Sequence, residues 1–266
     1  MMSRTQPNTL KILNTVFYLG VVFVNWLANT LPLGGATTGE VSAQYKNLFT
    51  PAGLTFSIWG LIYAFLLAFC LIQLVSMFKA KMPGVDVIVS KISLYFIVSS
   101  ICNMAWLFAW HYRRIELSLL VMICLLTSLI LIYRRLRTLD GLEQMSLWVK
   151  LSLVVPFSLY LAWITVATIA NTAILLVKMN WQGFGISPII WTVVVITVAT
   201  GIALINSFKD KDIFFSSVVV WAFIGIIMKR LNADTLYWPI IISAGIGILL
   251  ILVAAMYNSG KKTVSV

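Results

Sequence analysis

Eight long apolar segments follow one another along this chain, and short stretches that hold nearly all the charged residues separate them. A helix needs roughly 20 consecutive apolar residues to cross the hydrocarbon core of a bilayer. Of the 266 residues, 61% are hydrophobic and only 10% are charged, a composition that soluble globular domains do not have. The sequence therefore predicts an all-α, polytopic membrane helix bundle. Its spans are predicted at residues 12–33, 52–76, 92–111, 116–133, 150–177, 186–207, 213–229 and 236–257.

The 19 Lys and Arg residues are distributed unevenly between the two sides that these spans would define. Cytoplasmic segments of membrane proteins carry an excess of Lys and Arg. We therefore predict a multi-pass protein of the cell membrane with both termini in the cytoplasm. The net charge of +11 follows from this topology, so anionic membrane lipids are expected partners and nucleic acid is not. The opposite side would hold only Lys46, Arg113, Arg114, Lys178, Lys229 and Arg230.

The last three predicted spans differ in composition from the first five. They are rich in Val and Ile and contain few amide side chains, and their tryptophans lie near predicted span ends, as in the aromatic belts of membrane proteins. We therefore predict a five-helix membrane domain at residues 1–181 and an appended three-helix transmembrane bundle at residues 182–266. The tryptophans in question are Trp181, Trp191, Trp221 and Trp238.

The fifth predicted span carries an unusual stripe of aromatic and amide residues. Within the charge-free segment 156–171, residues i, i+3, i+7 and i+11 fall on one face of an α-helix. These positions are occupied by Tyr160, Trp163, Ala167 and Asn171. Lipid does not require such a face, so we expect it to point toward the interior of the protein.

Two other predicted spans carry similar faces. Asn103 and Trp106 lie three residues apart in the third span, and Trp59 and Tyr63 lie four apart in the second. Two interpretations stay open for all of these residues. They could hold helices together by packing and hydrogen bonding. They could also line a ligand pocket, in which rings give flat apolar contact and amides fix orientation.

The region around the first predicted span has three further polar features. Asn25 and Asn29 lie four residues apart on one face, and they suit hydrogen bonds between helices as well as contacts with a ligand. The loop that follows, rich in Gly and Thr, is long enough to be a lid, and a flexible surface loop fits equally well. His111, the only histidine, lies at a predicted span end and is interpreted as a solvated interfacial residue.

Residue patterns for conventional catalysis are missing from the sequence. All eight acidic residues fall in predicted loops or at helix ends, which removes the mid-membrane carboxylate that proton-coupled carriers use. The sequence has no cluster of His and Cys with metal-ligand spacing and no nucleotide-binding or nucleophile-elbow motif. We therefore expect no enzymatic activity, no metal site and no required cofactor. A membrane enzyme acting on a lipophilic substrate remains an alternative.

The three aromatic–amide faces resemble the signatures of the TspO/MBR family, the tryptophan-rich sensory proteins related to the mitochondrial translocator protein. Pro51 with Trp59 and Tyr63 is similar to the family's second-helix element, and Asn103 with Trp106 is similar to its third-helix motif. The fifth-helix pattern of the family resembles Tyr160, Trp163, Ala167 and Asn171. The resemblance covers residues 1 to about 180. The sequence departs from the family at Gly53, Thr55, Trp110 and His111, and in the spacing between Pro156 and Tyr160.

The resemblance implies a five-helix bundle, often homodimeric, that binds porphyrins, haem precursors or other flat lipophilic molecules between its helices. The function expected from it is a membrane receptor or sensor with a porphyrin- or haem-type ligand. A membrane transporter of a small lipophilic molecule is the alternative. The ligand-binding residues it implies are Trp59, Tyr63, Asn103, Trp106, Tyr160, Trp163, Ala167 and Asn171.

Overall fold

The computed structural model describes residues 7–31, 33–78, 82–139 and 146–260, and the regular structure of these residues is entirely helical. Seven of the described helices are long and apolar enough to cross a membrane, and a bent pair raises the number to eight. The predicted all-α, polytopic helix bundle is therefore confirmed. The predicted loops and termini contain charged residues that lie outside the described residues, namely Arg4, Lys79, Lys81, Asp140, Glu143, Lys261 and Lys262.

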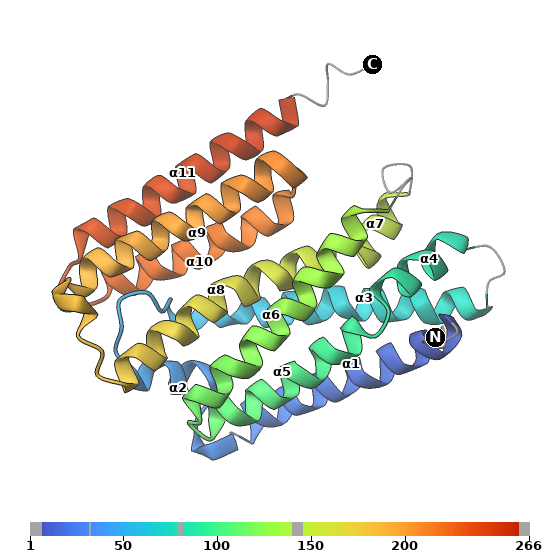
Figure 1. Ribbon diagram of the computed structural model, residues 1–266, viewed down its shortest axis with the longest axis horizontal. Coiled ribbons are helices and arrows are strands. Elements are labelled where there is room, and N and C mark those ends of the chain that lie inside the picture. Colours follow the sequence, from blue (N-terminus) through green and yellow to red (C-terminus); the bar gives the residue numbers. More distant parts are fainter. Residues whose placement is uncertain (1–6, 32, 79–81, 140–145, 261–266) are drawn as a thin grey trace. The chain divides into compact units, whose positions relative to one another are not determined.

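Internal packing divides the chain into two units, which are described separately. The first unit comprises Met1–Thr38 and Ile58–Ile164. In it α5 packs against α6 and α1, and α1 also packs against α3 (Figure 1). Its elements are α1 (Pro7–Thr30), η1 (Leu33–Gly35), α3 (Ile58–Phe78), α4 (Pro83–Ile92), α5 (Tyr95–His111), α6 (Ile115–Arg137), α7 (Leu147–Leu153) and the first part of α8 (Val155–Lys178).

Two breaks interrupt the helical spans of this unit. Pro156 lacks a backbone N–H and its ring would clash with a carbonyl of the preceding turn, so α7 ends and α8 begins next to it. Between α4 and α5 the chain turns by 54°. Ser93 caps α4 there with φ 53° and ψ −141°, outside the helical region. The third predicted span is therefore the bent pair α4 and α5.

An edge-to-face group of three phenylalanines forms part of the core of the first unit. Phe69 of α3, Phe96 of α5 and Phe157 of α8 are all buried, and their ring centroids lie 5.0 to 6.0 Å apart. Each of these pairs adds about 0.5–1.5 kcal/mol to the free energy gained by burying the rings. The group fixes α3, α5 and the start of α8 against one another, and these are the three helices that carry the aromatic–amide faces.

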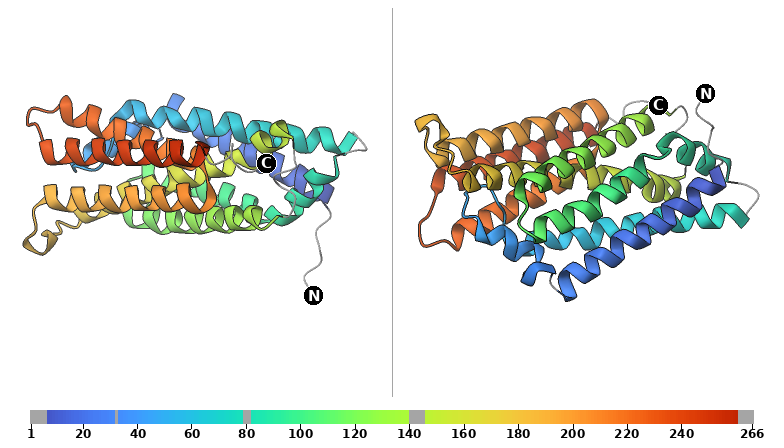
Figure 2. Two further views of the ribbon diagram at one scale, coloured as in Figure 1. Left: turned by 90° about the horizontal axis from the view of Figure 1, so that it is seen from above. Right: turned by 60° about the horizontal axis from the view of Figure 1, so that its bottom comes forward.

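The second unit comprises Gly39–Ser57 and Thr165–Val266. Here α9, α10 and α11 lie side by side, and the two further views show the same arrangement (Figure 2). Asp212 caps α10 by accepting hydrogen bonds from the amides of Phe214 and Phe215. The elements that follow Thr38 in this unit are α2 (Thr38–Gln44), η2 (Gly53–Ser57), the rest of α8, η4 (Gly183–Gly185), α9 (Pro188–Asp210), α10 (Ile213–Leu231) and α11 (Trp238–Gly260).

Close packing between these helices depends on small residues. A Cβ at Gly247 of α11 would lie 2.7 Å from the Thr200 hydroxyl of α9 and 2.7 Å from the Phe223 ring of α10. Glycine therefore lets the three helices approach one another, as small residues do in membrane bundles. Gly245, on the same helix, has no heavy atom within 4 Å of an added Cβ.

Several details of the sequence analysis change in the structure. The second span, predicted at residues 52–76, begins with the 3₁₀ turn η2, so Thr55 precedes α3. Trp221 lies in the middle of α10 and donates to the Thr55 carbonyl at 3.0 Å, so it is not an interfacial residue at a span end. Gly225 leaves room for this contact, because a Cβ there would lie 2.0 Å from the Thr55 hydroxyl.

The predicted division at residue 181 differs from the division of the packed units, because part of the chain before residue 181 packs in the second unit. Compact packing units and evolutionary domains are different properties, so the two-domain division stays a prediction.

Candidate functional site

Trp59 of α3 is the centre of a group of aromatic rings in the first unit. Its indole stacks on Tyr63 and meets Tyr160 and Trp163 edge to face. The ring centroids of Tyr63, Tyr160, Trp106 and Trp163 lie 5.5, 5.9, 6.2 and 6.3 Å from that of Trp59. Six predicted site residues therefore come together, which we call the aromatic–amide cluster: Trp59, Tyr63, Asn103, Trp106, Tyr160 and Trp163.

Helical spacing explains why these side chains meet. Trp59 and Tyr63 are one turn apart on α3, Asn103 and Trp106 one turn apart on α5, and Tyr160 and Trp163 one turn apart on α8. Each helix therefore contributes a pair from one face, as the sequence predicted.

Two amides link the aromatic rings by hydrogen bonds. Asn103, fully buried, donates from Nδ2 to the Tyr160 hydroxyl at 2.8 Å, joining α5 to α8. Asn25 of α1 donates to the Tyr63 hydroxyl, and the Tyr18 hydroxyl donates to the Tyr63 carbonyl at 2.9 Å. Asn25 therefore acts between helices, which is the first of its two predicted roles.

One buried acceptor in the cluster, an amide oxygen, has no donor among the described residues. It is the Oδ1 atom of Asn103, and the Tyr63 hydroxyl lies within hydrogen-bonding reach of the same amide group. A buried carbonyl oxygen without a donor costs about 1–3 kcal/mol. The cluster therefore has unused hydrogen-bonding capacity beside a set of flat apolar rings.

The remaining two predicted site residues belong to the second unit. Ala167 and Asn171 lie farther along α8, and the side chain of Asn171 is buried. Their predicted place on one helical face is consistent with the continuous helix from Val155 to Lys178. Their role in ligand binding stays a prediction.

The loop after α1 is fixed to the end of α5 by His111 and Trp110. His111 is completely buried, so the prediction of a solvated histidine is wrong. Its Nε2 lies 3.1 Å from the Thr38 hydroxyl and its Nδ1 lies 3.0 Å from the Leu33 carbonyl. Trp110 stacks on Trp106 and donates to the Thr38 carbonyl at 3.1 Å. The start of this loop is therefore held against the helix that carries Asn103 and Trp106.

Gly34 makes this attachment possible. Its φ is 63°, and a Cβ there would lie 2.4 Å from the His111 carbonyl oxygen. Arg113 stabilises the same contact, because it donates hydrogen bonds to the carbonyls of Gly34 and His111, at 2.5 and 2.9 Å. An ordinary side chain at position 34 would therefore separate the loop from α5.

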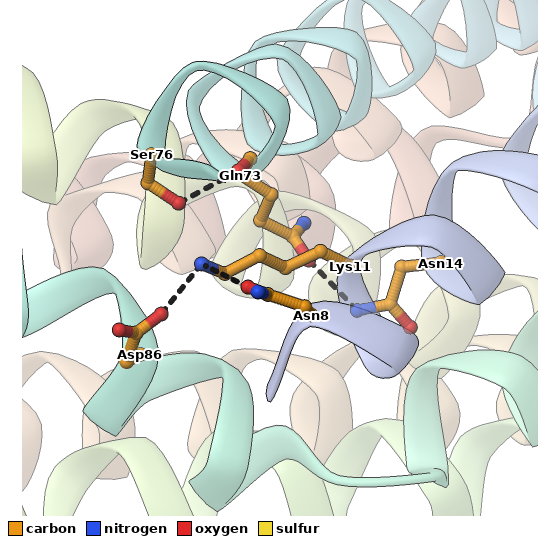
Figure 3. Close-up of polar contacts among 6 residues, drawn as sticks. All are labelled: Asn8, Lys11, Asn14, Gln73, Ser76 and Asp86. Carbon is orange, nitrogen blue, oxygen red and sulfur yellow. Dashed lines mark hydrogen bonds and ion pairs between the residues drawn. The ribbon is translucent and has the colours of Figure 1, made fainter. Parts of the chain in front are cut away.

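A second polar group, outside the predicted site, lies between α1, α3 and α4 (Figure 3). Lys11 is 1% exposed, and its Nζ lies 2.5 Å from a carboxylate oxygen of Asp86 and 3.4 Å from Oδ1 of Asn8. Asn14 donates to Gln73 at 2.9 Å, and both side chains are buried. We call these five residues the Lys11 cluster. Asp86, which was predicted in a loop or at a helix end, lies in the first turn of α4.

The described residues contain no group of three or more His, Cys, Asp or Glu side chains that could hold a metal ion. The first unit is a helical bundle with a neutral, aromatic-rich interior cluster. Its chemistry is stacking and hydrogen bonding.

Comparison with known proteins identifies the family. The family model for TSPO-like proteins matches residues 11–257, so the chain belongs to the TSPO-like family and is a membrane protein of the sensor or transporter type. The resemblance read from the sequence ended near residue 180, whereas this match also includes the last three helices, α9, α10 and α11. No curated protein and no solved structure matches the chain.

Proposed function

We propose that this protein is a membrane receptor or sensor that binds a tetrapyrrole, such as a porphyrin or haem precursor, or a similar flat lipophilic ligand at the aromatic–amide cluster. One observation carries the proposal. The Trp59 indole contacts four other rings, and the buried Asn103 beside them has an amide oxygen without a donor.

The two parts of the cluster match the two parts of such a ligand. Porphyrins present a large apolar face, which aromatic rings contact by stacking, and inner pyrrole N–H groups that an acceptor placed over the ring face can reach. Asn103 Oδ1 would accept a hydrogen bond from a ligand N–H and thereby lose its desolvation penalty. Trp59 is only 8% exposed, so a ligand reaches it only when neighbouring rings move apart.

Further features of the proposal come from the sequence. Ala167 and Asn171, farther along α8, stay candidate ligand-binding residues, Ala167 through its small side chain and Asn171 through its amide. The protein would lie in the cell membrane with both termini in the cytoplasm, and a homodimer is expected. No cofactor would be required, because the porphyrin- or haem-type molecule is the ligand.

The proposal is tested by titrating the purified protein with protoporphyrin IX and following the shift of its Soret absorbance. The double variant Trp59→Phe/Trp163→Phe keeps apolar bulk at both positions and removes much of the stacking area, so we expect at least about tenfold weaker binding. Trp26→Phe is the matched control, because Trp26 is 54% exposed on α1. Equal affinity in all three proteins would refute binding at this cluster.

The break between α4 and α5 favours transport of a small lipophilic molecule as a second candidate function. Discontinuous helices form the substrate sites of many transporters, and here the chain bends by 54° at Ser93. Flux of a porphyrin across proteoliposome membranes would support this function. Binding without flux would leave the receptor function as the better account.

A further inference from the structure

The last turn of α10 holds a cation, Arg230, in a buried position. Arg230 is 6% exposed, and its Nε is completely enclosed without a hydrogen-bond partner among the described residues. The nearest acidic residue along the chain, Asp234, is exposed and makes no ion pair with Arg230. The guanidinium therefore has an enclosed Nε and no counter-charge from the described part of the chain.

Such an arrangement is costly for a folded protein. A buried charge without a partner is destabilising by several kcal/mol, and charged side chains in membrane helices pair with one another or mark a binding site. The first unit follows this rule, because the buried Lys11 forms an ion pair with Asp86. Arg230 differs from Lys11 in that the described chain supplies no anion for it.

The neighbours of Arg230 make the site more positive. Half-buried Lys229 interacts electrostatically with it, and so does Tyr237, which precedes α11. The two cations and the phenol hydroxyl together offer hydrogen-bond donors to an anion. The guanidinium presents its donors in a planar fork that matches the oxygens of phosphate.

We propose that Arg230, Lys229 and Tyr237 form a binding site for a phosphate group at the end of α10, which we call the Arg230 site. Two adjacent cations favour a phosphate over a single carboxylate, because a phosphate offers more oxygens for a guanidinium and an ammonium to share. The site lies at the end of a predicted span, at the level where lipid head groups meet protein. A phospholipid head group and a free phosphate share this chemistry.

The experiment measures thermal unfolding of the full chain in neutral detergent with added phosphate groups. One arm adds inorganic phosphate, and the other adds a short-chain phosphatidylglycerol. A ligand that binds only the folded state raises the unfolding temperature with its concentration. A short-chain diacylglycerol, which has the same acyl chains and no phosphate, is run beside phosphatidylglycerol. Sodium chloride at matched ionic strength controls for screening in the phosphate arm.

Arg230→Met removes the buried charge and keeps a long apolar side chain. We expect it to raise the unfolding temperature without ligand and to abolish the shift caused by phosphate groups. Arg230→Lys keeps the charge without the fork, so we expect at least about tenfold weaker binding. Lys209→Gln is the control, because Lys209 is an exposed cation of α9 in the same unit.

The two arms identify the source of the phosphate. A shift with phosphatidylglycerol alone identifies a lipid head group, and a shift with inorganic phosphate identifies a free anion. The proposal is overturned if neither arm shifts the wild type beyond its sodium chloride or diacylglycerol control. It is also overturned if Arg230→Met and Lys209→Gln respond as the wild type does. The result is independent of porphyrin binding, because no porphyrin is present.

Discussion

The Lys11 cluster and the aromatic–amide cluster both lie in the first unit, and each contains a buried asparagine whose hydrogen bonding is incomplete. Asn14 and Asn103 are fully buried, each donates from Nδ2 to another side chain, and each has an Oδ1 without a partner among the described residues. Their surroundings differ. Asn14 lies near an ion pair, whereas Asn103 lies among aromatic rings.

The difference separates two uses of buried polar groups. The charged pair of the Lys11 cluster connects α1 to α4, and its amide pair connects α1 to α3, so we interpret this cluster as structural. The aromatic–amide cluster is neutral and offers flat rings beside a free acceptor, which suits a flat ligand with N–H groups. The following predictions test this distinction, beginning with the largest expected effect.

Trp59→Ala should cause the largest loss of stability. It removes the ring that contacts four others, and truncation of a buried aromatic side chain costs about 3–5 kcal/mol. Trp26→Ala removes the same side chain from an exposed position and should cost much less. Unfolding of both variants in detergent by increasing denaturant measures the difference. Equal losses would show that the cluster has no central role in packing.

Asp86→Asn should destabilise the first unit by about 2–3 kcal/mol. The change leaves Lys11 buried without its counter-charge, and the cost is below that of a fully buried pair because Asp86 is 52% exposed to water. The double variant Lys11→Met/Asp86→Asn removes both charges and should recover most of the stability. If the double variant is as unstable as Asp86→Asn, the ion pair is not the cause of the loss. Thermal unfolding of both variants in detergent provides the measurement.

Gln73→Leu should cost about 1–3 kcal/mol, because it leaves the Asn14 amide buried without its hydrogen bond. Replacing both residues by Leu should be close to neutral, since no polar group then remains unpaired. A double-mutant cycle of denaturant unfolding measures the coupling between the two side chains. Additive effects would contradict an interhelical role for this pair.

Sequence reasoning succeeded where the signal is local. Apolar segments of spanning length gave the helical membrane fold, and one-turn spacing on α3, α5 and α8 gave six residues that meet in space. Pro156 was recognised in the sequence, but the break that it causes in the fifth span was not predicted.

The failures concern partners that are distant along the chain. Trp110 and His111 bind the backbone or side chain of Thr38, which lies 72 and 73 residues away. Nothing near either residue in the sequence identifies that contact, so His111 was assigned to solvent. The Lys11 cluster was missed for the same reason, since its ion pair joins α1 to α4.

The affinity of protoporphyrin IX for Asn103→Leu and Asn14→Leu tests the central claim most directly. Both variants remove a buried asparagine with an unpartnered oxygen, so their structural effects are matched. We predict that Asn103→Leu weakens binding about tenfold, as expected for one lost hydrogen bond, and that Asn14→Leu binds as the wild type does. Equal dissociation constants for the wild type and both variants would contradict a ligand site at the aromatic–amide cluster.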